Sequence, residues 1–134
     1  MKLDHLGIAV KSLEAGIRFY HDALGLEVGH VEEVAGEKVR VAMLPLGDTR
    51  VELLEATAPE STIAKIVEKR GEGLHNIAVK VPDLAAAIAK LQAAGARLVN
   101  PEPQVGAGGH RYVFVHPKDS CGVLLELVEE RLSV

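Results

Sequence analysis

The sequence contains no tryptophan and only two phenylalanines and two tyrosines in 134 residues. Proteins that bind single-stranded nucleic acid stack bases on aromatic side chains, so this class is disfavoured. There are 15 Lys and Arg residues against 19 Asp and Glu, a net charge of −4. Without a basic patch we expect no nucleic-acid partner. Hydrophobic residues still make up 48% of the chain, so it can bury a core, and that core must be mainly aliphatic.

Cysteine is also scarce, because Cys121 is the only one in the sequence. A disulfide within the chain is therefore excluded, and a reducing compartment is expected. A catalytic thiol is not expected either, because Asp119 lies close to Cys121 and a reactive thiolate favours positive surroundings. The apolar run at the start of the chain is short and is broken by Asp4 and His5. We expect neither a signal peptide nor a membrane span, and hence a cytoplasmic protein with no membrane partner.

The first half of the chain predicts the element order β-α-β-β-β. Residues 2–10 alternate in polarity as a strand does, Ser12 can cap a helix, and apolar residues then recur at helical spacing until Gly25. Three segments rich in β-forming residues follow, separated by Gly36 and by the Gly47-Asp48 pair: residues 26–34, 39–46 and 50–54.

A short connector helix is predicted over residues 59–71, after which the same order of elements returns. Residues 75–81 predict a strand, and Asp83 can cap a helix that ends at Gly95. Three further strands are predicted at residues 96–99, 110–116 and 122–128.

The two halves match residue by residue. Residues 10–13 match residues 81–84, which lie 71 positions later, and residues 51–55 match residues 125–129, which lie 74 positions later. The difference of three residues fits into the glycine-rich loop at 106–109. Repetition at several elements predicts an architecture built from two equivalent units.

The sequence therefore predicts an α+β fold of paired βαβββ repeats, residues 2–56 and residues 73–130. With the connector helix 59–71, the repeats are expected to form a single domain over residues 1–134.

Matched polar residues in the repeats point to a metal site. Glu52 and Glu126 are a matched pair, and each interrupts an otherwise apolar strand, while His5 is matched by Asn76. A carboxylate in a core is costly unless a cation or a donor compensates it, although either strand alone could turn its carboxylate to solvent. Two carboxylates, an imidazole and an amide oxygen suit a divalent cation such as Mn²⁺, Co²⁺, Ni²⁺ or Mg²⁺. The sequence has too little sulfur for a structural zinc site.

Several motifs of this sequence resemble the glyoxalase/vicinal-oxygen-chelate superfamily and, within it, the methylmalonyl-CoA epimerase family. The resemblance covers residues 3–129. It is carried by His5-Leu6-Gly7-Ile8-Ala9-Val10, Phe19-Tyr20, Leu24-Gly25-Leu26, Leu44-Pro45-Leu46-Gly47-Asp48-Thr49, Gly71-Glu72-Gly73-Leu74-His75, Gly106-Ala107-Gly108-Gly109-His110-Arg111, His116-Pro117-Lys118 and Gly122-Val123-Leu124-Leu125-Glu126-Leu127.

The resemblance implies a half-open, barrel-like cup that holds a divalent metal ion, with Co²⁺ expected first. The implied ligands are His5, Glu52, Asn76 and Glu126. One of them departs from the family pattern, in which His-His stands where this sequence has His75-Asn76. An amide binds soft metals less well than an imidazole does. His75 is expected on the opposite face of its strand, because successive side chains alternate.

The resemblance further implies an isomerase that inverts C2 of methylmalonyl-CoA through a metal-stabilised enolate, with a CoA thioester as substrate and a homodimer as the assembly. Glu126 is the expected acid/base on one face of the substrate. The group for the other face is left open, because Arg40 stands where some members of the family have Glu and an arginine cannot act as a base. Arg111 and Lys118 either contact the substrate or are solvated surface charges.

Two alternative functions compete with an epimerase. A glyoxalase-type lyase would use the same four metal positions for a proton shift in a thiohemiacetal. A metal-free small-molecule-binding protein of the same fold is favoured by Asn76 and opposed by the retention of Glu52 and Glu126.

Overall fold

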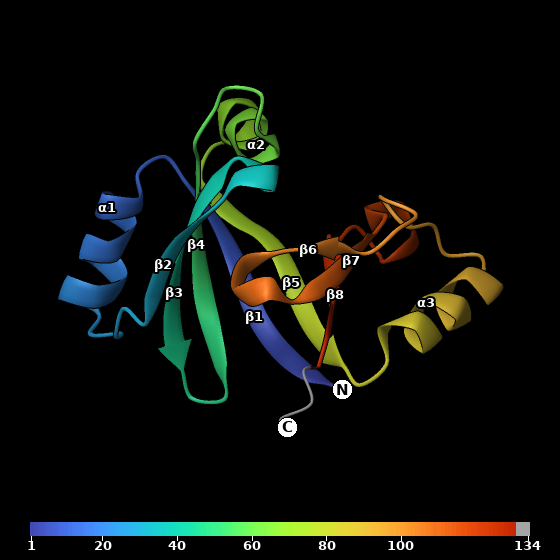
Figure 1. The fold of residues 1–134 in the computed structure, drawn as a ribbon. Coiled ribbons are helices and arrows are strands. Elements are labelled where there is room, and N and C mark those ends of the chain that lie inside the picture. The colour runs from blue at the N-terminus through green and yellow to red at the C-terminus, as the bar shows by residue number, and fades with distance from the viewer. Residues whose placement is uncertain (131–134) are drawn as a thin grey trace. The chain divides into compact units, whose positions relative to one another are not determined.

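The structure, a computed structural model, describes residues 1–130 of the chain and has the predicted α+β composition (Figure 1). The strands are β1 (Lys2–Val10), β2 (His30–Val34), β3 (Val39–Leu46), β4 (Thr49–Ala56), β5 (Gly73–Val81), β6 (Gln104–Val105), β7 (Arg111–Val115) and β8 (Leu125–Glu129). The helices are α1 (Leu13–Ile17), α2 (Thr62–Arg70) and α3 (Leu84–Ala93), and α1 continues as a π-helix over Arg18–Ala23. Within residues 1–130, no helix combines the length and the apolar character needed to cross a membrane.

The chain divides into two compact units. One unit runs from His5 to His75, and the other combines Met1–Asp4 with the chain from Asn76 onward. The connector between the repeats is α2, which begins after the cap Ser61 and ends at Gly71. The expectation that the two repeats form a single domain stays a prediction.

Both units have the same strand order, so the predicted paired βαβββ architecture is confirmed. In the first unit the order is β2-β3-β4-β1, where β3 and β4 form an antiparallel hairpin and β1 runs parallel to β4. In the second unit the order is β6-β7-β8-β5, where β7 and β8 are antiparallel and β5 runs parallel to β8. Figure 1 shows β2, β3 and β4 side by side in the first unit.

The register of the parallel strands repeats as well. Gly7 on β1 lies opposite Glu52 on β4, and Ala78 on β5 lies opposite Glu126 on β8. Ala78 follows Gly7 by 71 positions and Glu126 follows Glu52 by 74 positions, which are the two offsets found in the sequence. The two glutamates therefore occupy equivalent places among the strands of their units.

In each unit a helix packs against the strands over a mainly aliphatic core, as the low aromatic content requires. The core of the first unit consists of Val10, Leu13, Ala42, Leu44, Val51 and Leu53. The core of the second unit consists of Val81, Leu84, Val113 and Leu127. Three of these positions recur at the offsets of the repeat: Val10 with Val81, Leu13 with Leu84, and Leu53 with Leu127. Burying such side chains is the main source of stability in each unit.

The helices of the two units begin in the same way. The Ser12 side chain accepts a hydrogen bond of 3.2 Å from the Ala15 amide, and the Asp83 side chain accepts one of 3.0 Å from the Ala86 amide. Both residues are the predicted N-caps. Gly16 lets α1 pack closely on the sheet, because a Cβ at this position would lie 2.9 Å from Cδ1 of Leu53. The helix stops at Gly25, which has a φ of 97°.

Three predicted strands differ from the structure, and the two-residue strand β6 was not predicted; the strand predicted over residues 122–128 begins only at Leu125. The predicted strand over residues 96–99 is wrong, since Leu98 forms only an isolated bridge with Val115. Pro101 and Pro103 follow at once, and proline has no backbone N–H to extend a ladder. The strand predicted from residue 26 begins only at His30.

Candidate functional site

Two buried side chains meet on the sheet of the first unit. Nδ1 of His5 on β1 lies 3.3 Å from Oε2 of Glu52 on β4, and the two residues are 6% and 5% exposed. The neighbours of Glu52 in sequence, Val51 and Leu53, pack into the core beneath α1. Because side chains alternate along a strand, Glu52 points to the opposite face of this sheet. His5 and Glu52 thus form a buried pair on the face that α1 leaves open.

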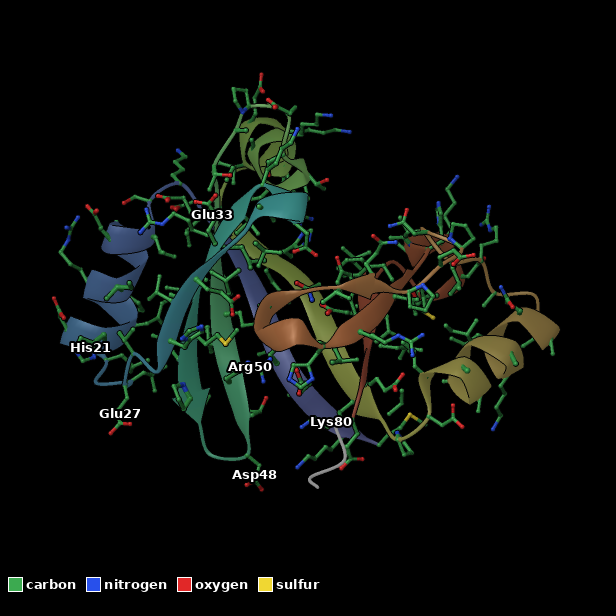
Figure 2. All side chains as sticks on the ribbon, viewed as in Figure 1. His21, Glu27, Glu33, Asp48, Arg50 and Lys80 are labelled. Carbon is green, nitrogen blue, oxygen red and sulfur yellow. The ribbon has the colours of Figure 1, made fainter. Side chains whose placement is uncertain are left out.

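Arg50 joins this pair, and the sequence did not single it out. Its Nε and Nη2 donate to Oε2 of Glu52 at 2.8 and 2.7 Å, and Nη2 lies 3.4 Å from Nδ1 of His5. Arg50 and Glu52 are two residues apart on β4, so both point to the same face. Figure 2 labels Arg50, a short distance along β4 from Asp48 at the β3–β4 turn. The positive charge that a buried Glu52 requires is therefore supplied by an arginine.

The matched pair of the second unit is held by an amide. Nδ2 of Asn76 on β5 donates a hydrogen bond of 2.8 Å to Oε1 of Glu126 on β8. Asn76 is 3% exposed and Glu126 is 9% exposed. This bond fixes the orientation of the carboxylate, and it directs the amide nitrogen of Asn76 towards Glu126.

The surroundings of Glu126 are mostly apolar. Its register partners on the two neighbouring strands are Ala78 and Phe114. Ala78 belongs to a buried cluster with Tyr112 and Val128, and Phe114 packs against this cluster. The rings of Tyr112 and Phe114 meet edge to face with their centroids 5.4 Å apart. A substrate on this face would meet a carboxylate in surroundings of low polarity.

The two glutamates thus differ although their positions match. Arg50 is matched by Leu124, which lies 74 positions later, so the second repeat carries no arginine at the place from which Arg50 contacts Glu52. Glu52 is held by a cation and Glu126 by a neutral amide. Equivalent backbones therefore present two carboxylates with different chemical environments.

His75 lies beside Asn76 in the sequence but belongs to the first unit. Burial and, to a smaller extent, the positive charge of Arg70 together lower the pKa of His75 to about 4. The imidazole is therefore neutral at pH 7. The strand alternation in β5 places its side chain on the face opposite to that of Asn76, in agreement with the expectation.

Arg40 lies away from the site. Its Nη1 donates a hydrogen bond of 3.2 Å to Oε1 of Glu55, which is its register partner on β4. Oε2 of Glu55 accepts a hydrogen bond of 2.9 Å from the Leu13 amide at the start of α1. Arg40 and Glu55 thus lie on the helix-covered face of the sheet, opposite to Glu52, and Arg40 takes no part in a site on the other face.

Other polar candidates make local contacts, and whether Arg111 and Lys118 contact a substrate stays a prediction. Arg111 lies 3.4 Å from Glu129 in an exposed pair. The His116 side chain accepts a hydrogen bond of 3.2 Å from the Lys118 amide and so caps a short turn. The glycines at 106–109 form a tight turn in which Gly108 and Gly109 have φ values of 73° and 75°. His30 lies 3.2 Å from Glu32 on the edge strand β2.

The donor types in the two pairs fit a divalent cation, because carboxylates, imidazole and amide oxygen all bind such ions. Among residues 1–130, however, no group of three or more His, Cys, Asp or Glu side chains comes together as a metal site. Each pair offers two ligands by itself, and Arg50 already contacts both ligands of the first pair. The expectation that His5, Glu52, Asn76 and Glu126 share one cation stays a prediction.

The chain matches the family model described as the Glyoxalase/Bleomycin resistance protein/Dioxygenase superfamily over residues 2–127. It is 41% identical over 128 residues to the ethylmalonyl-CoA/methylmalonyl-CoA epimerase of Cereibacter sphaeroides, covering 94% of this chain and 96% of that protein.

Two solved structures are also similar to it. The methylmalonyl-CoA epimerase of Mycobacterium tuberculosis has 39% sequence identity and a TM-score of 0.93, covering 98% of this chain and 89% of that chain. A variant of the methylmalonyl-CoA epimerase of Streptomyces coelicolor, in complex with 2-nitronate-propionyl-CoA, has 39% identity and a TM-score of 0.92. This second match covers 98% of this chain and 99% of that chain.

Proposed function

Because the chain belongs to the Glyoxalase/Bleomycin resistance protein/Dioxygenase superfamily, we propose that it is an epimerase that inverts C2 of methylmalonyl-CoA. The relatives named above support this assignment, since two carry the name methylmalonyl-CoA epimerase and the third the name ethylmalonyl-CoA/methylmalonyl-CoA epimerase. The predictions of the fold and of an enzyme resembling methylmalonyl-CoA epimerase are confirmed by these similarities. The substrate, the metal and the roles of individual residues are the content of the proposal.

The observation that carries the proposal is the hydrogen bond from Asn76 to Glu126. Inversion at C2 requires a base that removes the proton next to the thioester carbonyl. Oε1 of Glu126 is held by the Asn76 amide at 2.8 Å, so the carboxylate is oriented before the substrate arrives. We assign proton removal to Oε2 of Glu126. Its register partners Ala78 and Phe114 are apolar, and such neighbours would limit the access of water to a substrate bound there.

His5, Glu52, Asn76 and Glu126 are the residues that we assign to a divalent cation. When bound, such a cation supplies Lewis-acid stabilisation of the negative charge that develops on the thioester oxygen. Imidazole and carboxylate ligands suit Co²⁺, Mn²⁺ and Ni²⁺, and the oxygen donors also suit Mg²⁺. The equivalent registers of Glu52 and Glu126 support the assignment of both carboxylates to one function.

The deciding experiment is a proton-exchange assay with one epimer of methylmalonyl-CoA in deuterated solvent. The purified chain is measured with added Co²⁺ and after treatment with a chelator. We expect deuterium at C2 together with inversion of configuration, and a loss of both after chelation. Absence of exchange under every metal condition would contradict the proposed function.

A metal-free binding protein is the second candidate, and the Arg50–Glu52 contact favours it, because the guanidinium already compensates the buried carboxylate. Such a protein would bind acyl-CoA with the same affinity before and after chelation and would cause no exchange at C2. Turnover of a thiohemiacetal without exchange in methylmalonyl-CoA would instead identify a glyoxalase-type lyase. One set of assays therefore separates the three functions.

A further inference from the structure

Arg50 contacts both Glu52 and His5, the two side chains of the first unit that we assign to a cation. Two of its nitrogens donate to the same oxygen, Oε2 of Glu52, at 2.7 and 2.8 Å. One of them also lies 3.4 Å from Nδ1 of His5. A single positively charged group thus contacts one potential metal-binding atom on each of the two side chains, Oε2 of Glu52 and Nδ1 of His5.

An arginine and a metal ion cannot use these atoms at the same time. A divalent ion binds a carboxylate oxygen or an imidazole nitrogen at about 2.0–2.2 Å, and the guanidinium stands within hydrogen-bond distance of the same Oε2. The positive charge of Arg50 would also repel the ion, and this repulsion is strong in surroundings that exclude water. A metal bound at Oε2 of Glu52 or at Nδ1 of His5 would therefore have to displace Arg50 from that atom.

We propose that Arg50 is a resident cation that competes with the divalent metal for Glu52 and His5 and is displaced when the metal binds. This inference rests on the metal site of the proposed function. Without metal, Arg50 compensates the buried carboxylate and keeps the pair assembled. When the metal binds, the arginine side chain moves towards solvent, to which it is already open, being 25% exposed while the Glu52 side chain is 6% exposed.

The second repeat offers an internal comparison for this role. Leu124 is the residue matched to Arg50, and Glu126, two residues after it, accepts a hydrogen bond from Asn76. The repeated fold therefore tolerates an aliphatic residue at this place on the strand. An arginine two residues before the matched glutamate is present in the first repeat and absent from the second.

The test is the affinity of the metal-free, full-length chain for Co²⁺, measured by titration calorimetry. Arg50→Leu removes the competing charge and introduces the residue type of the second repeat, so we expect its affinity to rise by about tenfold or more. The matched control is Arg40→Leu, which removes the same charge from the same sheet but breaks only the pair with Glu55 on the opposite face. Its affinity should remain that of the unmodified chain. An unchanged or lower affinity in Arg50→Leu would overturn the proposal, and so would an equal rise in both variants.

Arg50→Leu leaves a buried carboxylate without its cation, so a second variant guards against loss of the fold. Arg50→Lys keeps the charge but contacts through one compact ammonium group in place of a fork of two nitrogens. We expect an affinity between those of the unmodified chain and Arg50→Leu. The rise in the midpoint of thermal unfolding on adding Co²⁺ should follow the same order, because a ligand stabilises the fold according to its affinity. A larger rise in the unmodified chain than in Arg50→Lys would contradict competition.

The two proposals can fail independently. If the chain binds no Co²⁺ and Arg50→Leu does, then competition by Arg50 is supported even without an epimerase assay. If neither binds Co²⁺, then Arg50 is not what limits metal binding and the inference falls. Absence of exchange at C2, with metal affinity rising in Arg50→Leu as expected, would remove the epimerase assignment alone.

Discussion

The amide of Asn76 donates to Oε1 of Glu126 at 2.8 Å, so one buried residue fixes the orientation of the other. The two residues lie on the parallel strands β5 and β8, whose register Ala78–Glu126 repeats that of Gly7–Glu52. A neutral amide thus donates to Glu126, the carboxylate to which we assign proton removal. An arginine contacts Glu52, the matched carboxylate of the first repeat.

Glu126→Gln should abolish proton exchange at C2 of methylmalonyl-CoA while leaving the fold intact. Glutamine keeps the volume of the side chain but cannot accept the proton, and a general base contributes about 10²- to 10⁴-fold to the rate. Exchange of the C2 proton in deuterated solvent measures the effect. The control is Glu129→Gln, three residues further along, where the carboxylate pairs with Arg111 in an exposed position. Unchanged exchange in Glu126→Gln would show that another residue removes the proton.

Asn76→His should raise the affinity for Co²⁺, because an imidazole nitrogen binds this metal better than an amide oxygen does. The ring can still donate a hydrogen bond to Glu126 through its second nitrogen. Calorimetric titration of the metal-free variant gives the affinity, with Asn100→His, in a segment without regular structure, as the control. A lower affinity in Asn76→His would place the fourth ligand elsewhere.

His75 should make the stability of the fold depend on pH below neutrality. Its pKa is about 4 in the folded chain and 6.5 when unperturbed, so the unfolded chain binds the proton first as the pH falls. The free energy of unfolding should therefore decrease from about pH 6.5 down to about pH 4, by about 2 to 3 kcal/mol in total. Urea unfolding of His75→Gln at pH 7.5 and at pH 4.5 should show a smaller difference than the unmodified chain does. His21→Gln, at a more exposed position, serves as the control, and an equal difference in all three proteins would contradict this account.

Gly16→Val should destabilise the fold by about 1–3 kcal/mol through overpacking. A Cβ at this position would lie 2.9 Å from Cδ1 of Leu53, a fully buried side chain with little room to move. The midpoint of urea unfolding measures the loss. The same substitution at Gly36, where a Cβ would meet nothing within 4 Å, is the control. Equal losses at both positions would mean that the close approach of α1 to the sheet is unimportant.

We propose that the chain forms a homodimer, because large apolar side chains are exposed on the π-helix that follows α1 and directly after its end. Phe19 is 59% exposed and Leu24 is 60% exposed. Burial of such side chains against a second copy is the usual way in which exposed apolar surface is removed from water. Light scattering at micromolar concentration should give about twice the chain mass of 14.3 kDa, and Phe19→Glu should lower it. A single-chain mass for the unmodified protein would refute the dimer.

The architecture was predictable from the sequence because the same pattern occurs twice. Glu52 and Glu126 could be found because a carboxylate inside an apolar strand is unusual, and their registers proved equivalent. Arg50 was missed although it lies two residues from Glu52, a spacing that puts both on one face of a strand. Charged residues near the end of a strand are common on surfaces, so burial and distance were needed to identify it.

The errors in the predicted elements have local causes. Leu98 belongs to a β-rich segment, but Pro101 and Pro103 prevent the backbone from extending the pairing beyond one bridge. The helix from Leu13 changes to a π-helix at Arg18, and the apolar spacing gives no sign of this change.

The parallel pairing of β1 with β4 bears on the order in which the chain can fold during synthesis. Leu6 pairs with Val51, so β1 can pair with β4 only after some 45 more residues have left the ribosome. The hairpin of β3 and β4 closes over a short turn and can form first. The ion pair of Asp4 with Lys80, at 3.5 Å, can form only later, because Lys80 belongs to the second repeat. The N-terminal strand thus gains its native partners late in synthesis. A nascent chain that stalls before Lys80 is made would leave this strand open to proteases.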